Sequence, residues 1–492
     1  MNERALWLAI AFCIVVRAVL QLGYGLGFEL DPWLWQLVDP RLLRDDTLRS
    51  LYLMHAQPPL FNALLALALK LPEGFAGPFL HLVLQAMSIV SVALVFLLLR
   101  RARLDPVGAA IAAGLFGVLP QVLIYESVFN YAPLEAMFLL AGTLFAARYL
   151  EDGRLGRFAG LCVCLVILAL TRSLFHIGWI AVVLLVVWGL RAWRHRRQGR
   201  GQGWALAVLV ASLAVVSSVY FKNLRLYGIF AASSWEGIAL TQMAAPWMDS
   251  DRAKFPQAYA DLRARIDRGE FSPALKAGLS QFIWYGWMET AKDCGQMEET
   301  RPVLCAKRRS NGEPNLNHLA VVDYSRDLSR DARRLLLLYP QPYLNHVAAS
   351  AMTFLGTPSW DYRQFDRFLP RYTALWNELV LYRPGRVLAG TQQAGNWWGS
   401  LTNRLAGSSV PVMVLVIAGM ALVLWRGASG AWGYWRGREE RADWVFPAFA
   451  VLLYATVPHL TNGVEAQRIR YSIEPLLYVA LITAGSGLLR RR

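Results

Sequence analysis

The sequence predicts an all-α protein that crosses a membrane many times. Of its 492 residues, 56% are hydrophobic and 17% are charged, whereas soluble proteins have about 25% charged residues. Several apolar runs approach or exceed 18 residues, the length that spans a bilayer as a helix. The net charge of +16 comes largely from short arginine clusters at the ends of these runs, which favours anionic lipid headgroups over nucleic acid as partners.

Taken in order, the apolar runs predict about ten membrane spans. The first, 5–26, is too long for a signal peptide and has no A-x-A cleavage site after it, so we interpret it as an uncleaved span. The run 58–71 is too short to cross about 30 Å of hydrocarbon and is expected to lie at the outer surface. The remaining predicted spans are 78–99, 106–125, 132–150, 158–170, 174–190, 204–220, 410–425, 444–459 and 476–489.

Placing the N-terminus inside puts every short arginine cluster on the inner side, as the positive-inside rule requires. Three regions follow: an N-terminal membrane module, 1–221, whose first outer loop is 27–77; an extracytoplasmic, mainly helical domain, 222–405; and C-terminal membrane helices, 406–492. The hydropathy shows no internal repeat, which counts against transporters built from inverted repeats.

The same orientation gathers unusual polar residues at the outer face of the membrane. They lie in the first outer loop, at the start of the fourth span, at the turn between the fifth and sixth spans, and just before the last span. They are Asp31, His55, Gln57, Glu135, Arg172, His176, Arg468, Arg470, Tyr471 and Glu474. Acids and bases that converge on one membrane face suit a substrate with an anionic headgroup and a long lipid tail.

Several of these residues also have a simpler interpretation. Asp31 precedes Pro32 and could cap a helix, because Asp favours the N-cap and Pro the first turn. Glu135 could complement the positive end of a helix dipole. Arg468 and Arg470 could bind any lipid phosphate. The functional hypothesis therefore depends on the joint placement of these residues.

The order of these features resembles the GT-C superfamily of glycosyltransferases that use polyprenyl-phosphate sugars, in particular the protein O-mannosyltransferases and the lipid A aminoarabinose transferases. HAQPPLFNALL, 55–65, is similar to the surface-helix motif of that superfamily. YAPLEAM, 131–137, corresponds to the position of its second acid, and RIRYSIEPLL, 468–477, resembles its late R-Y-x-x-x-x-P-L motif. The resemblance covers about residues 1–225 and 440–490 and implies a GT-C-like transmembrane bundle.

The resemblance also implies roles for individual residues. Asp31 would be the general base on the acceptor hydroxyl, with Glu135 in support. Asp31, Glu135 and His55 could hold a divalent metal ion that bridges the lipid phosphate. The residues expected to bind the donor and its phosphate are His55, Gln57, Arg172, Arg468, Arg470 and Tyr471.

A sugar on a polyprenyl monophosphate already has a good leaving group. The reaction therefore needs a base on the acceptor and positive charge on the departing phosphate, which arginine supplies through a bidentate contact. In-line attack would invert the anomeric centre. The expected partners are the lipid-linked sugar donor, a glycan, lipid or protein acceptor, and membrane lipids.

The segment 222–405 is rich in tryptophan, whose indole favours the bilayer interface and also stacks on sugar faces. It contains Cys294 and Cys305, which on the oxidising side of the membrane predict a disulfide, with two unpaired thiols as the alternative. The other cysteines lie in apolar runs and are expected to be inert: Cys13, Cys162 and Cys164.

Two other functions stay open. An O-antigen ligase or polymerase would use lipid diphosphate donors, but such enzymes concentrate Arg and His in a late outer loop. A lipid or solute transporter should carry ionisable residues at mid-membrane depth, where this sequence clearly has only Arg17. The expected location is a bacterial inner membrane with the active site on the periplasmic side.

Overall fold

A computed structural model of the chain shows a helical protein. The described residues are 3–25, 27–28, 30–32, 36–195, 200–245, 249–280, 294, 301–355, 410–438, 442–461 and 466–489. Within this part of the chain the regular structure consists of 22 α-helices and includes no sheet. The prediction of an all-α fold is therefore confirmed.

Six of the described helices are long and apolar enough to cross a membrane. They are α1 (Glu3–Tyr24), α5 (Ala76–Arg101), α8 (Ala132–Asp152), α10 (Ile177–Arg194), α11 (Arg200–Tyr227) and α24 (Val410–Trp435). Each coincides with an apolar run of the sequence. The chain is therefore an integral membrane protein by the length and composition of these helices.

Shorter apolar helices complete the bundle. They are α4 (Leu60–Leu69), α6 (Pro106–Gly117), α9 (Leu155–Thr171), α25 (Val445–Thr461) and α27 (Glu474–Leu489). Helix α8 lies at the centre and contacts α5, α9, α10, α25 and α27. It is the most buried of the six long helices, so polar side chains on α8 face protein instead of lipid.

The predicted span 106–125 is wrong as a single helix. Helix α6 ends at Gly117, and α7 (Pro120–Glu126) starts after a break in which Leu119 has an extended ψ of 142°. Pro120 explains the break, because proline cannot donate the helical hydrogen bond and disfavours helix at the preceding residue. Gly117 permits close packing, since a Cβ there would lie 2.5 Å from Cγ2 of Val92.

Two predicted spans end too early. Helix α24 continues to Trp435, although the span was expected to end near residue 425 where Arg426 begins the polar sequence. Arg426 does not stop the helix because its guanidinium donates to Thr483 Oγ1 (2.6 Å) on the adjacent α27. Helix α11 continues to Tyr227, so the expected boundary between the first two regions at residues 221 and 222 falls inside a helix.

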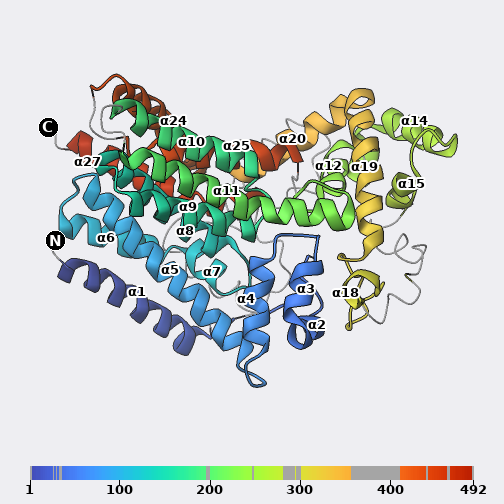
Figure 1. Ribbon diagram of the computed structural model, residues 1–492, viewed down its shortest axis with the longest axis horizontal. Coiled ribbons are helices and arrows are strands. Elements are labelled where there is room, and N and C mark those ends of the chain that lie inside the picture. Colours follow the sequence, from blue (N-terminus) through green and yellow to red (C-terminus); the bar gives the residue numbers. More distant parts are fainter. Residues whose placement is uncertain are drawn as a thin grey trace.

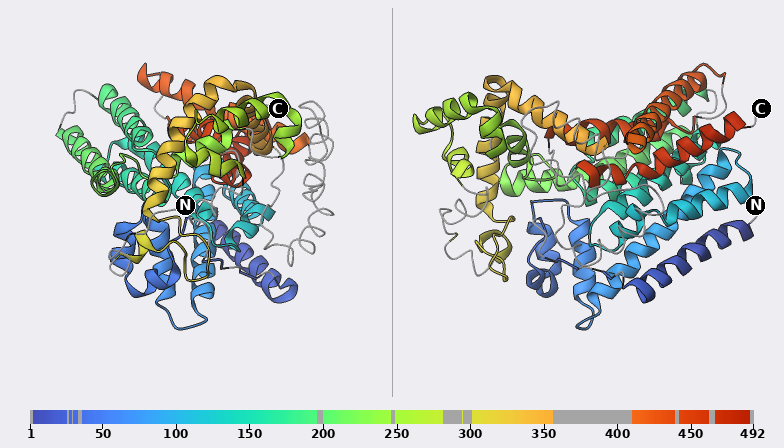
Figure 2. Two further views of the ribbon diagram at one scale, coloured as in Figure 1. Left: turned by 90° about the vertical axis from the view of Figure 1, so that its right-hand side faces the viewer. Right: turned by 180° about the vertical axis from the view of Figure 1, so that it is seen from behind.

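The two ends of the bundle differ. Both chain termini lie at one end, here called the terminal end (Figure 1). The opposite end, here called the loop end, carries the helices of the first loop and of residues 236–355 (Figures 1 and 2). They are α2 (Pro40–Asp45), α3 (Thr47–Leu53), α12 (Glu236–Ala244), α13 (Asp249–Lys254), α14 (Pro256–Asp267), α15 (Pro273–Ser280), α18 (Pro302–Cys305), α19 (Leu319–Leu338) and α20 (Pro340–Leu355).

The described part of 222–405 has its own apolar core, formed mainly by α12, α14, α15 and α19. Helices α12 and α19 cross very closely, because a Cβ on Gly237 would lie 1.7 Å from the carbonyl oxygen of Ser325. Residues 356–409 lie outside the described residues, as do these tryptophans of the predicted loop and outer domain: Trp33, Trp35, Trp247, Trp284, Trp287, Trp360, Trp376, Trp397 and Trp398.

The orientation across the membrane gives a testable prediction. Glu73 is exposed in the turn after α4, and Arg154 is exposed in the turn between α8 and α9. We expect a membrane-impermeant maleimide to label Glu73→Cys in intact cells and Arg154→Cys only after permeabilisation. The three free cysteines are buried, so the parent protein provides a low background. Labelling of Arg154→Cys in intact cells would show that the chain has the opposite orientation.

Candidate functional site

A buried carboxylate joins four segments at the loop end of the bundle. Glu135, in the first turn of α8, is 0% exposed. It accepts hydrogen bonds from the Tyr454 hydroxyl (2.8 Å) on α25 and from Ser472 Oγ (2.6 Å) just before α27. Arg172, between α9 and α10, pairs with it at 3.3 Å. The structure therefore brings together two of the residues singled out in the sequence, Glu135 and Arg172.

Arg172 connects this carboxylate to α4 through aromatic rings. Its guanidinium carbon lies 4.7 Å from the centre of the Tyr131 ring, which stands edge-on to Phe61 of α4 at 5.5 Å. Phe61 in turn stacks on Phe129 at 4.3 Å. The Arg172 side chain is 13% exposed, whereas Glu135 beneath it is enclosed. Arginine has further N–H donors in a planar fork, the geometry that binds phosphate oxygens.

The segment before α27 is a second point of convergence. Arg470 on α26 (Ala466–Tyr471) is almost fully buried, where it pairs with Glu474 at 2.7 Å and donates to the carbonyl of Phe354. Tyr471 is also buried and packs its ring on Tyr125 at 4.2 Å. Both residues therefore fix α26 to its neighbours and present little surface to a ligand. The side chain of Arg468 lies outside the described residues.

His55 is enclosed at the loop end with both ring nitrogens bonded. Nδ1 lies 2.7 Å from Ser234 Oγ, and Nε2 lies 2.9 Å from the carbonyl of Asn317. Burial, followed by the nearby ammonium of Lys222, lowers the pKa of His55 to about 3. A neutral, fully bonded imidazole is a positioning group for the chain around it.

The backbone around His55 is held from the outer domain as well. The Asn317 side-chain oxygen accepts from the amides of His55 (3.1 Å) and Ala56 (3.0 Å), and the amide of Ser234 donates to the carbonyl of His55 (2.9 Å). Gln57 is buried and donates to the carbonyl of Gln36 at 3.2 Å. We call residues 53–57 the clamped segment.

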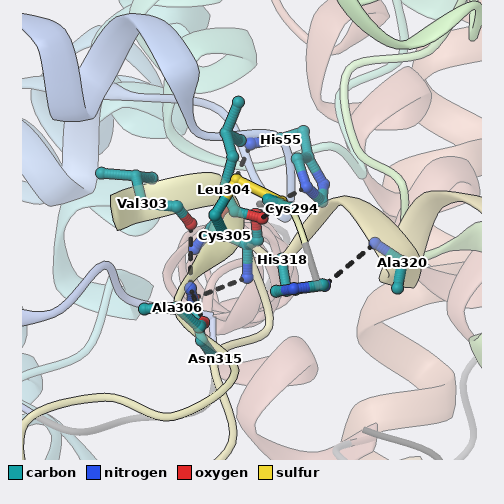
Figure 3. The surroundings of a disulfide bond; sticks show 10 residues. His55, Cys294, Val303, Leu304, Cys305, Ala306, Asn315, His318 and Ala320 are labelled. Carbon is teal, nitrogen blue, oxygen red and sulfur yellow. Dashed lines mark hydrogen bonds between the residues drawn. A yellow bond between two sulfur atoms is a disulfide. The ribbon is translucent and has the colours of Figure 1, made fainter. Parts of the chain in front are cut away.

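A disulfide supports the clamped segment. Cys294 and Cys305 are bonded to each other, which agrees with the pairing predicted from their position in the sequence. Figure 3 shows this disulfide beside His55 and His318. Cys305 belongs to the apolar cluster that contains Met54 and Phe61, and Cys294 packs against the same cluster, so the bond lies where α18 packs on the first loop.

Asp31 lies partly buried in an irregular stretch of the first loop. A different Asp-Pro pair in this loop caps a helix: Asp39 accepts from the amide of Arg41 (2.8 Å) at the start of α2. Asp39 also accepts from the amide and hydroxyl of Ser310. Burial lowers the pKa of the adjacent Arg309, while the carboxylates of Glu313, Asp31 and Asp39 oppose that shift. Asp31 therefore lies within the electrostatic reach of Arg309.

The metal ligand set that the resemblance implied is not assembled. Among the described residues, which include Asp31, Glu135 and His55, no three His, Cys, Asp or Glu side chains group closely enough to hold a metal ion. His55 is bonded through both ring nitrogens, and the Glu135 carboxylate accepts from Tyr454 and Ser472 and pairs with Arg172.

Sequence reasoning missed several residues of this region. Tyr131 and Ser472 lie inside two of the motifs and could have been singled out there. Tyr454 sits in an uninterrupted apolar run, where only a phenol amid aliphatic residues signals a buried polar partner. Ser234 and Asn317 carry no signal in the sequence, because their role depends on contact with a segment more than 170 residues away.

The buried histidine predicts a pH dependence of stability. In the unfolded chain His55 binds a proton below about pH 6.5, whereas the folded protein excludes that proton down to about pH 3. The stability that depends on a neutral His55 should therefore be fully present above pH 6.5. Below that pH, the free energy of unfolding should fall by at most about 1.4 kcal/mol per pH unit because of this histidine. Thermal unfolding from pH 8 to pH 5 should show a smaller decrease for His55→Gln than for the parent. Parallel decreases would contradict this account.

The chain matches no protein-family model, no curated protein and no solved structure. A functional assignment therefore has to come from the chemistry of the residues described above.

Proposed function

We propose that this protein is a GT-C-type membrane glycosyltransferase that moves a sugar from a polyprenyl-phosphate donor to an acceptor hydroxyl. The observation that carries the proposal is the Glu135–Arg172 pair. One arginine, whose side chain is 13% exposed, is held at the loop end by a buried carboxylate and lies near α4. The order of motifs that resembles the GT-C superfamily supports the same function.

The chemistry assigned to the site needs two groups. The acceptor oxygen attacks the anomeric carbon as the bond from that carbon to the phosphate oxygen breaks, and Asp31 takes the proton from the acceptor. Arg172 stabilises the negative charge that develops on the departing lipid phosphate. Attack opposite the leaving group inverts the anomeric configuration.

The enclosed residues take supporting roles in this proposal. His55, Gln57 and Tyr471 are buried, so we assign to them the positioning of the first loop and of α26. Arg470 is buried against Glu474, so Arg172 is the principal phosphate contact. The shorter apolar helices complete a bundle of about ten spans, placed in a bacterial inner membrane with the site on the periplasmic side.

A transporter is the second candidate, because an ion pair between α1 and α7 is buried within the bundle. Arg17 of α1 pairs with Glu126 of α7 at 2.7 Å, and both side chains are buried. Arg17 also donates to the carbonyl of Cys13. Ionisable residues at this depth mark transport pathways in many proteins. Incubation of the purified protein with a radiolabelled polyprenyl-phosphate sugar and a mixture of acceptors separates the two functions, since only the enzyme releases the sugar from its lipid.

The first prediction of this mechanism concerns Asp31. Asp31→Asn keeps the shape of the side chain but cannot accept a proton, so transfer should fall by about 10²–10⁴-fold. Donor binding should change much less. The matched control is Asp46→Asn in the same loop, where Asp46 caps α3 and Asn caps a helix about equally well. Near-normal transfer by Asp31→Asn would remove the catalytic assignment.

The second prediction separates two arginines. Arg172→Gln should weaken donor binding by about 10–100-fold, the value of a hydrogen bond between charged groups, and should also destabilise the protein, because buried Glu135 loses its charge partner. Arg470→Gln should destabilise the protein as well, by about 3–5 kcal/mol, because it leaves the partly buried Glu474 without its charge partner, but its folded fraction should keep the parent affinity for the donor. Donor binding and thermal unfolding are measured on both variants. An unchanged donor affinity for Arg172→Gln would contradict the proposed phosphate contact.

A further inference from the structure

Three partly exposed indoles stack at the terminal end of the bundle. Trp193 lies at the end of α10, and Trp432 and Trp435 lie at the end of α24. The ring centres are 5.9 Å apart for Trp193 and Trp435 and 5.2 Å apart for Trp432 and Trp435. Their exposed fractions are 50%, 52% and 41% in chain order. Large indole surfaces at the end of a membrane bundle are expected to lie at the lipid–water interface. We call these residues the tryptophan stack.

Two arginines lie against aromatic rings at this end of α24. The guanidinium carbon of Arg436 is 4.1 Å from the centre of the Trp432 ring, and that of Arg194 is 4.4 Å from the Tyr434 ring. Arg194 also donates to the carbonyl of Tyr434 at 3.5 Å, whereas Arg436 is exposed. Arginine carries five N–H donors in a planar fork that matches phosphate oxygens, so Arg436 can offer donors to an anion beside the stack.

The stack is fixed to the bundle through a buried neighbour. Tyr434 is fully buried, and its hydroxyl donates to the carbonyl of Leu150 at the end of α8 (2.6 Å). Arg191 of α10 donates to the same carbonyl at 3.0 Å. Helices α8, α10 and α24 therefore end together, and the aromatic surface has a defined shape before any ligand arrives.

The local charge favours an anionic ligand. The sequence from Arg191 to Arg200 contains five arginines and no acidic residue. The sequence also places Glu439 and Glu440 directly after Arg438, so the arginines of both segments outnumber the acids. Of the described acids at this end, Glu151 and Asp443 both pair with Arg101. Under the positive-inside rule this end faces the inner leaflet, whose surface is anionic.

From this geometry we infer that the tryptophan stack, with Arg194 and Arg436, is a binding site for the headgroup of an anionic phospholipid of the inner leaflet. The indoles would lie at the level of the glycerol backbone, and the arginine donors would contact the headgroup phosphate. The inference does not depend on the proposed glycosyltransferase activity, because the site lies at the opposite end of the bundle (Figure 1).

Native mass spectrometry of the full chain tests the inference. The protein is equilibrated with dioctanoyl phosphatidylglycerol and, separately, with dioctanoyl phosphatidylcholine. The parent should bind the anionic lipid in preference to the neutral one. Arg436→Gln should reduce the affinity for phosphatidylglycerol about tenfold, the loss of one hydrogen bond to a charged group. Trp432→Ala should reduce it as well.

Matched controls lie on the same helix and beside it. Trp425→Ala removes an indole that is 66% exposed elsewhere on α24, and Arg438→Gln removes an exposed charge two residues from Arg436. Both should retain the parent preference. All four positions are exposed, so the variants should keep the fold, which thermal unfolding checks. If thermal unfolding shows that Trp432→Ala has lost its fold, the affinity of Arg436→Gln decides the test.

Three outcomes would overturn the inference. The first is equal affinity of the parent for the two lipids. The second is the same loss of affinity in Trp425→Ala or Arg438→Gln as in the stack variants. The third is displacement of phosphatidylglycerol by an equimolar amount of inorganic phosphate, which would make the site one for free anions.

Discussion

The structure depends on the satisfaction of one buried carboxylate. A carboxylate removed from water is costly unless it is paired and hydrogen-bonded. Glu135 obtains its partners from Arg172, Tyr454 and Ser472, which lie up to 337 residues away in the sequence. Each partner is satisfied only when its helix is in register with α8. The same interaction that makes the bundle specific therefore also leaves Arg172 oriented toward the surface helix.

The sequence predicts the helices better than it predicts their ends. Apolar runs locate the membrane helices because lipid requires continuous apolar surface and internal backbone hydrogen bonds. The run 106–125 misleads because Pro120 is apolar and does not interrupt the hydropathy, although it interrupts the helix. The end of α24 is predicted too early for the opposite reason. Arg426 resembles an interface residue in the sequence, yet its guanidinium is hydrogen-bonded within the bundle.

The candidate site could also be predicted from the sequence only in part. Topology alone could place Glu135 and Arg172 at one face, because both lie at the ends of adjacent spans. It could not show that His55 is enclosed, since a histidine in an outer loop is ordinarily exposed. That outcome depends on Ser234 and Asn317, which lie 179 and 262 residues away in the sequence. Such long-range polar contacts leave no periodicity for a sequence to display.

The clamped segment has a consequence for the synthesis of the protein. Residues 53–57 emerge early from the ribosome, but their backbone partners follow much later: Lys222 donates to the carbonyl of Met54, and Asn317 holds His55 and Ala56. Under the proposed orientation, these partners must also cross the membrane first. The first loop must therefore wait, with buried amides still solvated, while most of the bundle is inserted around it. Maturation of the loop end is a late event, although its sequence is among the first to be made.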